Sequence, residues 1–316
     1  MRILIIGAGG FAGSHLADVL LAATPDAEVW GCDLTSERRP FHPPALKLLG
    51  VDLRDPQETR SVVEICHPER IYHLAGQAFV GQSWSNPWET LEANLRPEVN
   101  LFEAVRTACL ETRFLIVSSA DVYGHVPPGA LPITETCSFC PDSPYGVSKV
   151  GQDLLGLQYY LSHGLHIVRV RPFNHIGPRQ NSRFVAPSFA SQIAAIEAGI
   201  QPPVVKVGNL KARRDMTDVR DMVKAYVLAL EQCVSGEAYN IGSAHSHSIQ
   251  ELLDILLSFS TIRIKTEIDP TRLRPSNIPD LVCDASKFRK ATGWSPQIPF
   301  EQSPKDLLEY ERLRMG

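Results

Sequence analysis

The feature that most constrains the fold is a glycine-rich turn close to the start of the chain. Residues 2–6 form an apolar run, and residues 11–23 form an amphipathic stretch typical of a helix. Gly7, Gly10 and Gly13 follow the run at a spacing of three. In a strand–turn–helix unit, such glycines permit the tight turn, the approach of a phosphate and close packing of the helix. We therefore expect a dinucleotide pyrophosphate to bind here, at Gly7, Gly10, Phe11, Ala12 and Gly13; a merely tight turn is the alternative.

The first half of the chain alternates short apolar runs with amphipathic stretches. Strands are predicted at 2–6, 28–32, 46–51, 70–74, 113–118 and 166–171, and helices at 11–23, 58–66, 89–110 and 145–163. Strands that alternate with helices form a parallel sheet covered on both faces. The sequence therefore predicts an α/β fold with a doubly wound parallel sheet of the Rossmann type.

The second half is broken into shorter pieces by proline residues. Helices are predicted at 186–198, 219–232, 249–259 and 300–314, and short strands at 204–207, 238–241 and 263–266. We expect a dinucleotide-binding domain over residues 1–172, to which a segment near 215–244 returns. Residues 173–316 would then form mainly a smaller, C-terminal substrate-binding domain.

Composition excludes several classes of protein. Lys and Arg number 31 against 35 Asp and Glu, so the net charge of −4 argues against nucleic acid or a membrane surface as partner. No uncharged apolar run approaches the roughly 18 residues of a membrane span. Because the chain enters its first strand at once, we expect no signal peptide and a cytoplasmic location. The seven cysteines include one C-x-x-C pair, Cys137 and Cys140, without a second pair, so neither a disulfide framework nor a metal site is expected.

An acidic residue after the second predicted strand bears on the choice of cofactor. Asp33 stands 20 residues beyond Gly13, where an acid accepts hydrogen bonds from the adenine ribose and repels a 2′-phosphate, which favours NAD. Arg38 and Arg39 could instead receive a 2′-phosphate if their loop folds back, although a solvated loop is the interpretation we favour. Asp52 and Leu53, after the third strand, are placed to cap the adenine edge; Asp52 could equally be a helix N-cap.

A tyrosine and a lysine form the second strong pattern. Tyr145 and Lys149 are four residues apart and therefore share one face of a predicted helix. A free phenol has a pKa of about 10, and a neighbouring ammonium stabilises the phenolate and lowers that pKa. Ser119 follows the fifth predicted strand, at the sheet edge where open α/β folds bind ligands. Its hydroxyl can hold a substrate oxygen while the tyrosine exchanges a proton with it.

With these residues the whole chain resembles the extended short-chain dehydrogenase/reductase family, whose members are nucleotide-sugar epimerases, dehydratases and reductases. The resemblance rests on the glycine turn, the stretch 73–77, Ser119, and the Tyr145/Lys149 pair. Four further stretches, 171–178, 207–210, 214–221 and 273–276, resemble the GDP-4-keto-6-deoxy-D-mannose reductases of that family. This likeness implies NAD or NADP as cofactor, with the reduced form consumed.

The resemblance also implies roles for single residues. Tyr145 would be the acid/base, Lys149 its electrostatic partner and the anchor of the nicotinamide ribose, and Ser119 the ligand of the substrate oxygen. The cofactor would further be lined by Leu74, Ala75, Asn94 and Pro172. On the substrate side, Gln77 and Ser83 would face the sugar, Asn174 would hold the pyrophosphate side, and Arg214 and Arg274 would bind the phosphates, as arginine forks suit phosphate oxygens. The alternatives are a pair of Arg214 with Asp215 or Asp218, and a simple loop position for Arg274.

The residues after Ser119 bear on the reaction type. Dehydratases of this family place an acid or hydroxyl there, then a glutamate, whereas this chain has Ala120 and Asp121. Alanine cannot protonate a leaving hydroxyl, so elimination is disfavoured and hydride transfer remains, with the role of Asp121 open. The resemblance thus implies NAD(P)H-dependent reduction of GDP-4-keto-6-deoxy-D-mannose at C4 to GDP-D-rhamnose. A nucleotide-sugar 4-epimerase, a GDP-mannose 4,6-dehydratase and a non-catalytic cofactor sensor are the alternatives.

Family dimers pair two helices from each subunit. In this chain those helices would be the predicted segments 89–110 and 145–163. The resemblance therefore implies a homodimer held together by a four-helix bundle.

Overall fold

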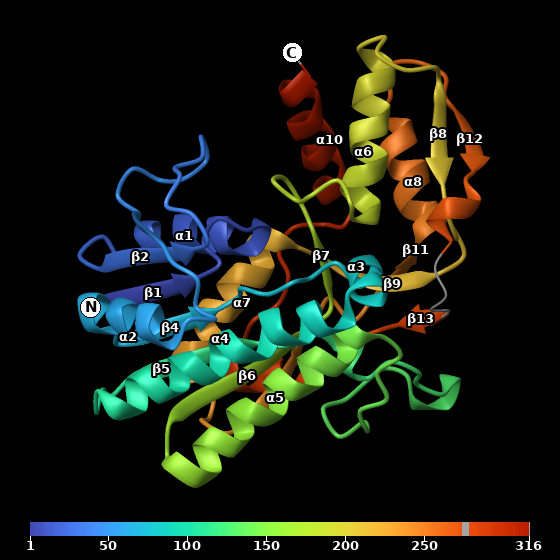
Figure 1. The fold of residues 1–316 in the computed structure, drawn as a ribbon. Coiled ribbons are helices and arrows are strands. Elements are labelled where there is room, and N and C mark those ends of the chain that lie inside the picture. Colours follow the sequence, from blue (N-terminus) through green and yellow to red (C-terminus); the bar gives the residue numbers. More distant parts are fainter. Residues whose placement is uncertain (274–277, 316) are drawn as a thin grey trace.

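The computed structural model describes residues 1–273 and 278–315. A seven-stranded sheet forms its centre, with strand order β10-β6-β5-β4-β1-β2-β3 (Figure 1). All neighbouring strands in this sheet run parallel. The strands are β1 (Arg2–Ile6), β2 (Glu28–Asp33), β3 (Lys47–Gly50), β4 (Arg70–His73), β5 (Arg113–Val117), β6 (His166–Pro172) and β10 (Ala238–Ile241). The predicted α/β, doubly wound fold is confirmed.

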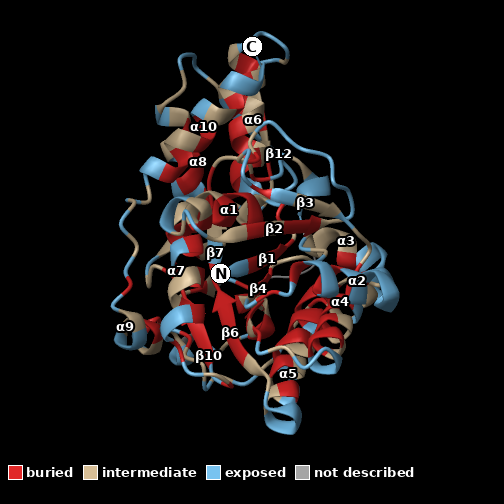
Figure 2. Ribbon diagram, turned by 90° about the vertical axis from the view of Figure 1, so that its left-hand side faces the viewer, coloured by how far each residue is buried: buried red, intermediate tan, exposed pale blue. Residues whose placement is uncertain are grey.

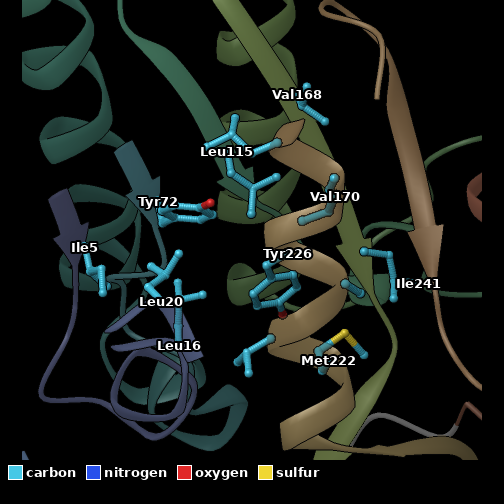
Figure 3. Packing of buried hydrophobic residues seen from close by; sticks show 14 of the residues in the cluster. Ile5, Leu16, Leu20, Tyr72, Leu115, Val168, Val170, Met222, Tyr226 and Ile241 are labelled. Atoms are coloured by element: carbon cyan, nitrogen blue, oxygen red, sulfur yellow. The ribbon is translucent and has the colours of Figure 1, made fainter. Parts of the chain in front are cut away.

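Helices cover both faces of the sheet, because alternate side chains of each strand point to opposite sides. On β1, Ile3 and Ile5 join one buried cluster, and Leu4 and Ile6 join another. The first cluster packs under α1 (Phe11–Ala23) and α7 (Val219–Gln232). Figure 3 shows Tyr226 of α7 on the side of Leu16 and Leu20, and Met222 on the side of Ile241. The second packs under α2 (Pro56–Cys66), α4 (Pro87–Thr107) and α5 (Pro144–His163). Figure 2 shows the buried strands between these two layers.

The segment near 215–244 divides between the two parts of the molecule. Strand β9 (Arg213–Asp218) belongs to a separate small sheet, whereas α7 and β10 join the seven-stranded sheet through parallel pairing of β10 with β6. Helix α9 (Ser286–Thr292) also packs there, against α7 and β10, and brings Phe288 into the first cluster. The chain therefore crosses between the two parts more than once.

The remaining elements gather at one end of the molecule (Figure 1). They are α6 (Val185–Glu197), α8 (Ile249–Ser258) and α10 (Gln302–Met315), the pair β8 (Val204–Val207) with β12 (Lys265–Ile268), and a small sheet in which β9 carries β7 (Asn174–Ile176), β11 (Ser246–Ser248) and β13 (Asp280–Leu281). A third buried cluster fills the space between the three helices and β8. Ser248 and Glu251 form a capping box that starts α8.

Several short elements were not predicted from the sequence. They are β7, β9, β11, β13, α9, the helix α3 (Val80–Ser85), and three 3-10 turns at Ala120–Val122, Pro128–Ala130 and Pro270–Arg272. Most are too short to show a hydrophobic period, and β9 is rich in charged residues, which apolar patterning does not detect. In the part of the chain that the structure describes, no helix is both long and apolar enough to cross a membrane.

Candidate active site

The glycine turn adopts a shape that other residues would not allow. Gly7 has a φ of +88°, and a Cβ on it would lie 2.9 Å from the Ala75 backbone nitrogen. A Cβ on Gly13 would lie 2.1 Å from the Gly7 carbonyl oxygen, so α1 can pack this closely only with glycine there. Helix α1 begins after Gly10, and no side chain in the described ranges caps its first N–H groups. A bare helix N-terminus in contact with a glycine turn fits the pyrophosphate of a dinucleotide.

Two charged side chains flank this turn at the end of β2. The Asp33 carboxylate accepts a hydrogen bond from the Gly9 N–H at 3.0 Å and another from the Leu34 N–H. Arg39 reaches back from the following loop, and its Nη1 donates to the Gly9 carbonyl oxygen at 2.9 Å. Arg38 instead donates to the carbonyl oxygens of Pro43 and Leu46 within the same loop. Both arginines are exposed, as expected for a solvated loop, yet the loop does fold back and brings Arg39 beside Asp33 and Gly9.

Asp52 is not the helix N-cap that the sequence allowed as an alternative. Asp55 caps α2, accepting from the N–H groups of its second and third residues, while Asp52 pairs with Arg54 at 2.6 Å. The hydrogen bond from Arg54 lowers the pKa of Asp52 below its ordinary value. The neighbouring Leu53 is buried, and its carbonyl oxygen accepts from the Asn100 side chain.

The loop after β4 is fixed against the glycine turn. The Leu74 N–H donates to the Ile6 carbonyl oxygen, and Ala75 lies against Gly7. Asn94 of α4 is fully buried: its Oδ1 accepts from the Gln77 N–H at 2.7 Å, and its Nδ2 donates to the Ser148 hydroxyl at 2.7 Å. Asn94 therefore ties this loop to α5, and its role toward a cofactor stays a prediction. Pro172, at the end of β6, is buried beside β10.

The three expected catalytic residues come together at the carboxyl edge of the sheet. Ser119 follows β5, and its hydroxyl accepts from the Asp121 N–H at 3.1 Å. It lies near enough to Tyr145, in the first turn of α5, to influence the pKa of that phenol. The Lys149 Nζ lies 6.0 Å from the Tyr145 ring centre and donates to the Val117 carbonyl oxygen at 2.9 Å. Helix α5 starts one residue before Tyr145, with the Ser143 side chain as its N-cap, which fixes where both residues point.

Burial shifts the proton affinities of this group. The prediction that Lys149 lowers the pKa of Tyr145 was wrong for this structure. Burial raises the pKa of Tyr145 well above its ordinary value, the nearby Asp121 raises it further, and the Ser119 hydroxyl opposes the rise. Burial lowers the pKa of Lys149 to about 8, against the effect of the Glu98 carboxyl. The phenol therefore holds its proton at neutral pH, as a general acid must before reaction.

Of the residues expected to bind the substrate, some are exposed and others are buried or already hydrogen-bonded within the protein. Asn174 on β7 is exposed and available to a ligand. Ser83 is fully buried, and its hydroxyl donates to the Val80 carbonyl oxygen within α3. The Gln77 side chain donates to the Phe79 carbonyl oxygen in its own loop and to the Thr90 hydroxyl on α4. The roles of Ser83 and Gln77 toward a sugar stay predictions.

Arg214 on β9 is half-buried and donates to the carbonyl oxygens of Arg213 and Ile278. The two acids suggested as its alternative partners are engaged elsewhere. Asp215 accepts from three backbone N–H groups, those of Ser243, Ala244 and Cys283, and Asp218 pairs with Arg220. Arg274 lies outside the described residues.

Sequence reasoning missed two contacts beside this site, one of them made by Phe11, which was itself expected at the cofactor. Phe11, at the start of α1, stacks on His175 with ring centres 5.7 Å apart and an interplanar angle of 10°. Glu98 and Gln152 form a buried polar chain behind Lys149. Nothing in the local sequence connects Phe11 with His175 or Glu98 with Gln152, because each pair meets only through the tertiary fold.

Comparison with known proteins identifies the family. The sequence model of the GDP-mannose 4,6 dehydratase family matches residues 4–307. The chain belongs to this family. A curated relative, the GDP-6-deoxy-D-mannose reductase of Pseudomonas aeruginosa, is 34% identical over 308 residues, 97% of this chain and 96% of the relative. GDP-mannose 4,6 dehydratase 2 of Arabidopsis thaliana is 30% identical over 270 residues, 84% of this chain and 71% of the relative.

Solved structures agree with this assignment. RMD from Pseudomonas aeruginosa complexed with NADPH has a TM-score of 0.85 at 33% identity, over 99% of this chain and 100% of that one. A UDP-glucose 4-epimerase of Thermus thermophilus in complex with NAD has a TM-score of 0.88 at 29% identity, over 99% of both chains. The expected family, extended short-chain dehydrogenases/reductases, and the enzyme class, NAD(P)-dependent sugar-nucleotide oxidoreductases, are confirmed for this member of the GDP-mannose 4,6-dehydratase family.

Proposed function

We propose that the protein reduces the C4 ketone of GDP-4-keto-6-deoxy-D-mannose to give GDP-D-rhamnose, with NADH or NADPH consumed. The observation that carries the proposal is a buried phenol, Tyr145, that keeps its proton near Ser119 and Lys149, with a buried alanine at position 120. The 34% identity to a GDP-6-deoxy-D-mannose reductase over nearly the full length of both chains supports the same reaction.

The reduced nicotinamide, when bound, supplies the hydride to C4. The Ser119 hydroxyl donates a hydrogen bond to the ketone oxygen and fixes its position. As negative charge develops on that oxygen, the Tyr145 hydroxyl transfers its proton to it. The Lys149 ammonium then stabilises the phenolate that remains on Tyr145. Each step uses a side chain at the carboxyl edge of the sheet, where β5 and α5 bring the three together.

The two parts of the chain hold the two ligands. We propose that residues 1–172 bind the dinucleotide, with its pyrophosphate at the start of α1 beside Gly7, Gly10 and Gly13. Residues 173–316 hold mainly the GDP-sugar, through Asn174, Arg214 and Arg274. Because the substrate pyrophosphate is an anion, guanidinium groups give both charge and paired hydrogen-bond donors.

The residue at position 120 favours reduction over dehydration. Removal of water across C5 and C6 requires a base near C5 and an acid at the C6 oxygen. Ala120 is buried in the short turn after Ser119 and carries no proton. The N–H of the next residue, Asp121, donates to the Ser119 hydroxyl.

One experiment tests the proposal against its rivals. The purified protein is incubated with GDP-4-keto-6-deoxymannose and NADPH or NADH, the absorbance of the cofactor is followed, and the product stereochemistry is read by NMR. We expect one reduced cofactor consumed per ketone and a C4 hydroxyl with the configuration of GDP-D-rhamnose. GDP-mannose, supplied alone with oxidised cofactor, should lose no water by mass spectrometry. Interconversion of C4 epimers without net cofactor consumption would replace the proposal with an epimerase.

We further propose a cytoplasmic homodimer in which α4 and α5 of two copies form a four-helix bundle. Large apolar side chains are exposed on these helices, including Trp88 on α4 and Leu154 and Leu161 on α5. A second copy would remove them from water, which favours association. Light scattering after gel filtration should give twice the chain mass. The double variant Leu154→Glu, Leu161→Glu should give a monomer, whereas Leu313→Glu, at an exposed leucine of α10, should not; a monomeric wild type contradicts the proposal.

A further inference from the structure

A buried chain of polar groups leads away from the active-site lysine. The Lys149 Nζ donates to the Gln152 Oε1 at 2.6 Å, in addition to its bond to Val117. The Gln152 Nε2 in turn donates to the Glu98 Oε2 at 2.9 Å. Glu98 and Gln152 are both fully buried, so water does not screen this chain. One amide therefore connects a buried carboxyl on α4 to a buried amine on α5.

Of the ionisable groups near Glu98 in the described residues, Lys149 is the one that can give it an unpaired positive charge. From β4, the His73 Nε2 lies 3.9 Å from the Glu98 Oε2, but burial lowers the pKa of His73 to about 3, so this imidazole is neutral at ordinary pH. From α5, Asp153 adds a negative charge, which two arginines of β6 neutralise: Arg169 at 2.6 Å and Arg171 at 2.7 Å.

A lone ammonium in such a place is costly, because burial removes its water without supplying an opposite charge. Burial lowers the pKa of Lys149 to about 8, and the Glu98 charge acts in the opposite direction. Burial also raises the pKa of Glu98 well above its ordinary range, while the Lys149 charge and the Gln152 hydrogen bond oppose that rise, so Glu98 carries its charge only as the partner of a charged Lys149. Each group thus stabilises the charged form of the other.

The hydrogen bonding of Glu98 does not itself require a carboxylate. Among the residues that the structure describes, its Oε1 has no hydrogen-bond partner, and its Oε2 accepts from the Gln152 amide alone. A glutamine at position 98 could keep that acceptor with its carbonyl oxygen. Substitution by glutamine would therefore remove the charge and keep the shape and the hydrogen bond, which separates an electrostatic role from a packing role.

We propose that Glu98 is a positioning residue: as a buried carboxylate it holds Lys149, through the Gln152 amide, as an ammonium directed at the Val117 carbonyl and beside Tyr145. This inference rests on the proposed role of Lys149 as the charge partner of Tyr145. It adds a residue that contacts neither substrate nor cofactor and that determines up to which pH Lys149 stays charged.

The first test measures Lys149 without any substrate. In protein labelled with ¹³C and ¹⁵N lysine, the Lys149 signal is assigned by its loss in Lys149→Met, and its pKa is titrated by NMR. We expect Glu98→Gln to lower that pKa by roughly one to two units, as for opposite charges separated by one amide at an effective dielectric constant of about 20. Glu311→Gln, at a buried carboxyl of α10 that pairs with Arg314, is the matched control and should leave it unchanged.

The second test uses the pH dependence of kcat/KM for ketone reduction. Loss of a buried negative charge lowers the pKa of neighbouring groups, so the alkaline limb should move to lower pH by the same interval in Glu98→Gln. Above the limb, kcat/KM should fall roughly tenfold per unit of that shift. Glu98→Asp keeps the charge and should restore most of the limb, and Gln152→Met, which removes the connecting amide, should shift it as Glu98→Gln does.

An unchanged Lys149 pKa in Glu98→Gln, in a variant that binds NADPH normally, would overturn the inference and leave Glu98 as a neutral packing residue. Should Glu98→Gln fail to fold, Glu98→Asp and Gln152→Met decide the same question. Since the NMR titration needs no turnover, loss of the proposed reductase activity in the wild type would refute the proposed function without deciding the Glu98 inference.

Discussion

Arg39 is the residue on which we expect the use of NADPH to depend. Its Nη1 donates to the Gly9 carbonyl oxygen at 2.9 Å, and the same Gly9 donates its N–H to Asp33. An acid after the second strand of such a fold binds the ribose 2′-hydroxyl, while an arginine nearby accommodates a 2′-phosphate. Here both stand at one turn, so the carboxylate and the guanidinium act in opposite directions on a phosphorylated ribose.

The size of the effect follows from this geometry. A hydrogen bond to a charged group contributes about 1.5–3 kcal/mol, and because Arg39 is exposed we take the lower end of that range. Arg39→Ala should therefore weaken NADPH binding roughly tenfold to thirtyfold and leave NADH binding within about twofold. Asp33→Asn should act in the other direction, because it removes the charge that repels the phosphate.

The assay compares dissociation constants for NADPH and NADH by calorimetry, and kcat/KM for both cofactors with the ketone. Arg38→Ala is the matched control, because Arg38 lies in the same loop but bonds to Pro43 and Leu46. If Arg39→Ala leaves the ratio of NADPH to NADH affinity unchanged, Arg39 only braces the glycine turn. An equal loss in Arg38→Ala would mean that the loop as a whole, and not Arg39, sets the preference.

Three further outcomes are expected. Tyr145→Phe removes the proton donor but keeps the ring, so kcat should fall by roughly 10²–10⁴ while NADPH affinity measured by calorimetry persists; near-normal turnover would exclude Tyr145 as the acid. Arg214→Ala should raise KM for the GDP-sugar by roughly 10-fold to 100-fold without changing NADPH binding, since one charge-assisted bond contributes about 1.5–3 kcal/mol; unchanged GDP affinity would make Arg214 structural. Arg312 lowers the pKa of Glu197 to about 2, so Glu197→Gln should reduce the free energy of unfolding by about 2 kcal/mol at pH 7 in urea titrations, and this difference should disappear as pH falls from about 4.5 toward 2.

The parts of the fold that could be predicted are those whose side chains are buried in a regular period. Strand β1 and helices α1 and α7 have the bounds that the sequence predicted, because apolar residues run up to a glycine, a polar cap or a loop. Strand β9 was missed because Arg213–Asp218 carries mainly charged and polar residues. Asp215, Thr217 and Asp218 are nevertheless buried, and the strand pairs with three others. Its burial depends on partners from distant parts of the chain, which a local pattern does not contain.

The candidate site divides in the same way. Tyr145 and Lys149 could be placed together because a helix fixes the spacing of residues four apart, and Gly7 and Gly13 because backbone contact demands them. The direction of the Arg39 side chain could not be predicted from the sequence, since it depends on how a 13-residue loop between β2 and β3 folds back. Glu98 and Gln152 are separated by 54 residues and meet only where α4 packs on α5.

The surroundings of Tyr145 suit the proposed reduction of a ketone. Burial and Asp121 raise the pKa of the phenol, so it keeps its proton until hydride reaches the ketone and makes the oxygen a strong base. After the proton transfer, the Lys149 ammonium stabilises the buried phenolate, and for this it must itself remain charged. Glu98 is the carboxyl that keeps it charged, through the Gln152 amide. Because Ala120 offers no proton to a second oxygen, the same environment that favours protonation at O4 leaves the C6 position without an acid, and the reaction ends at the alcohol.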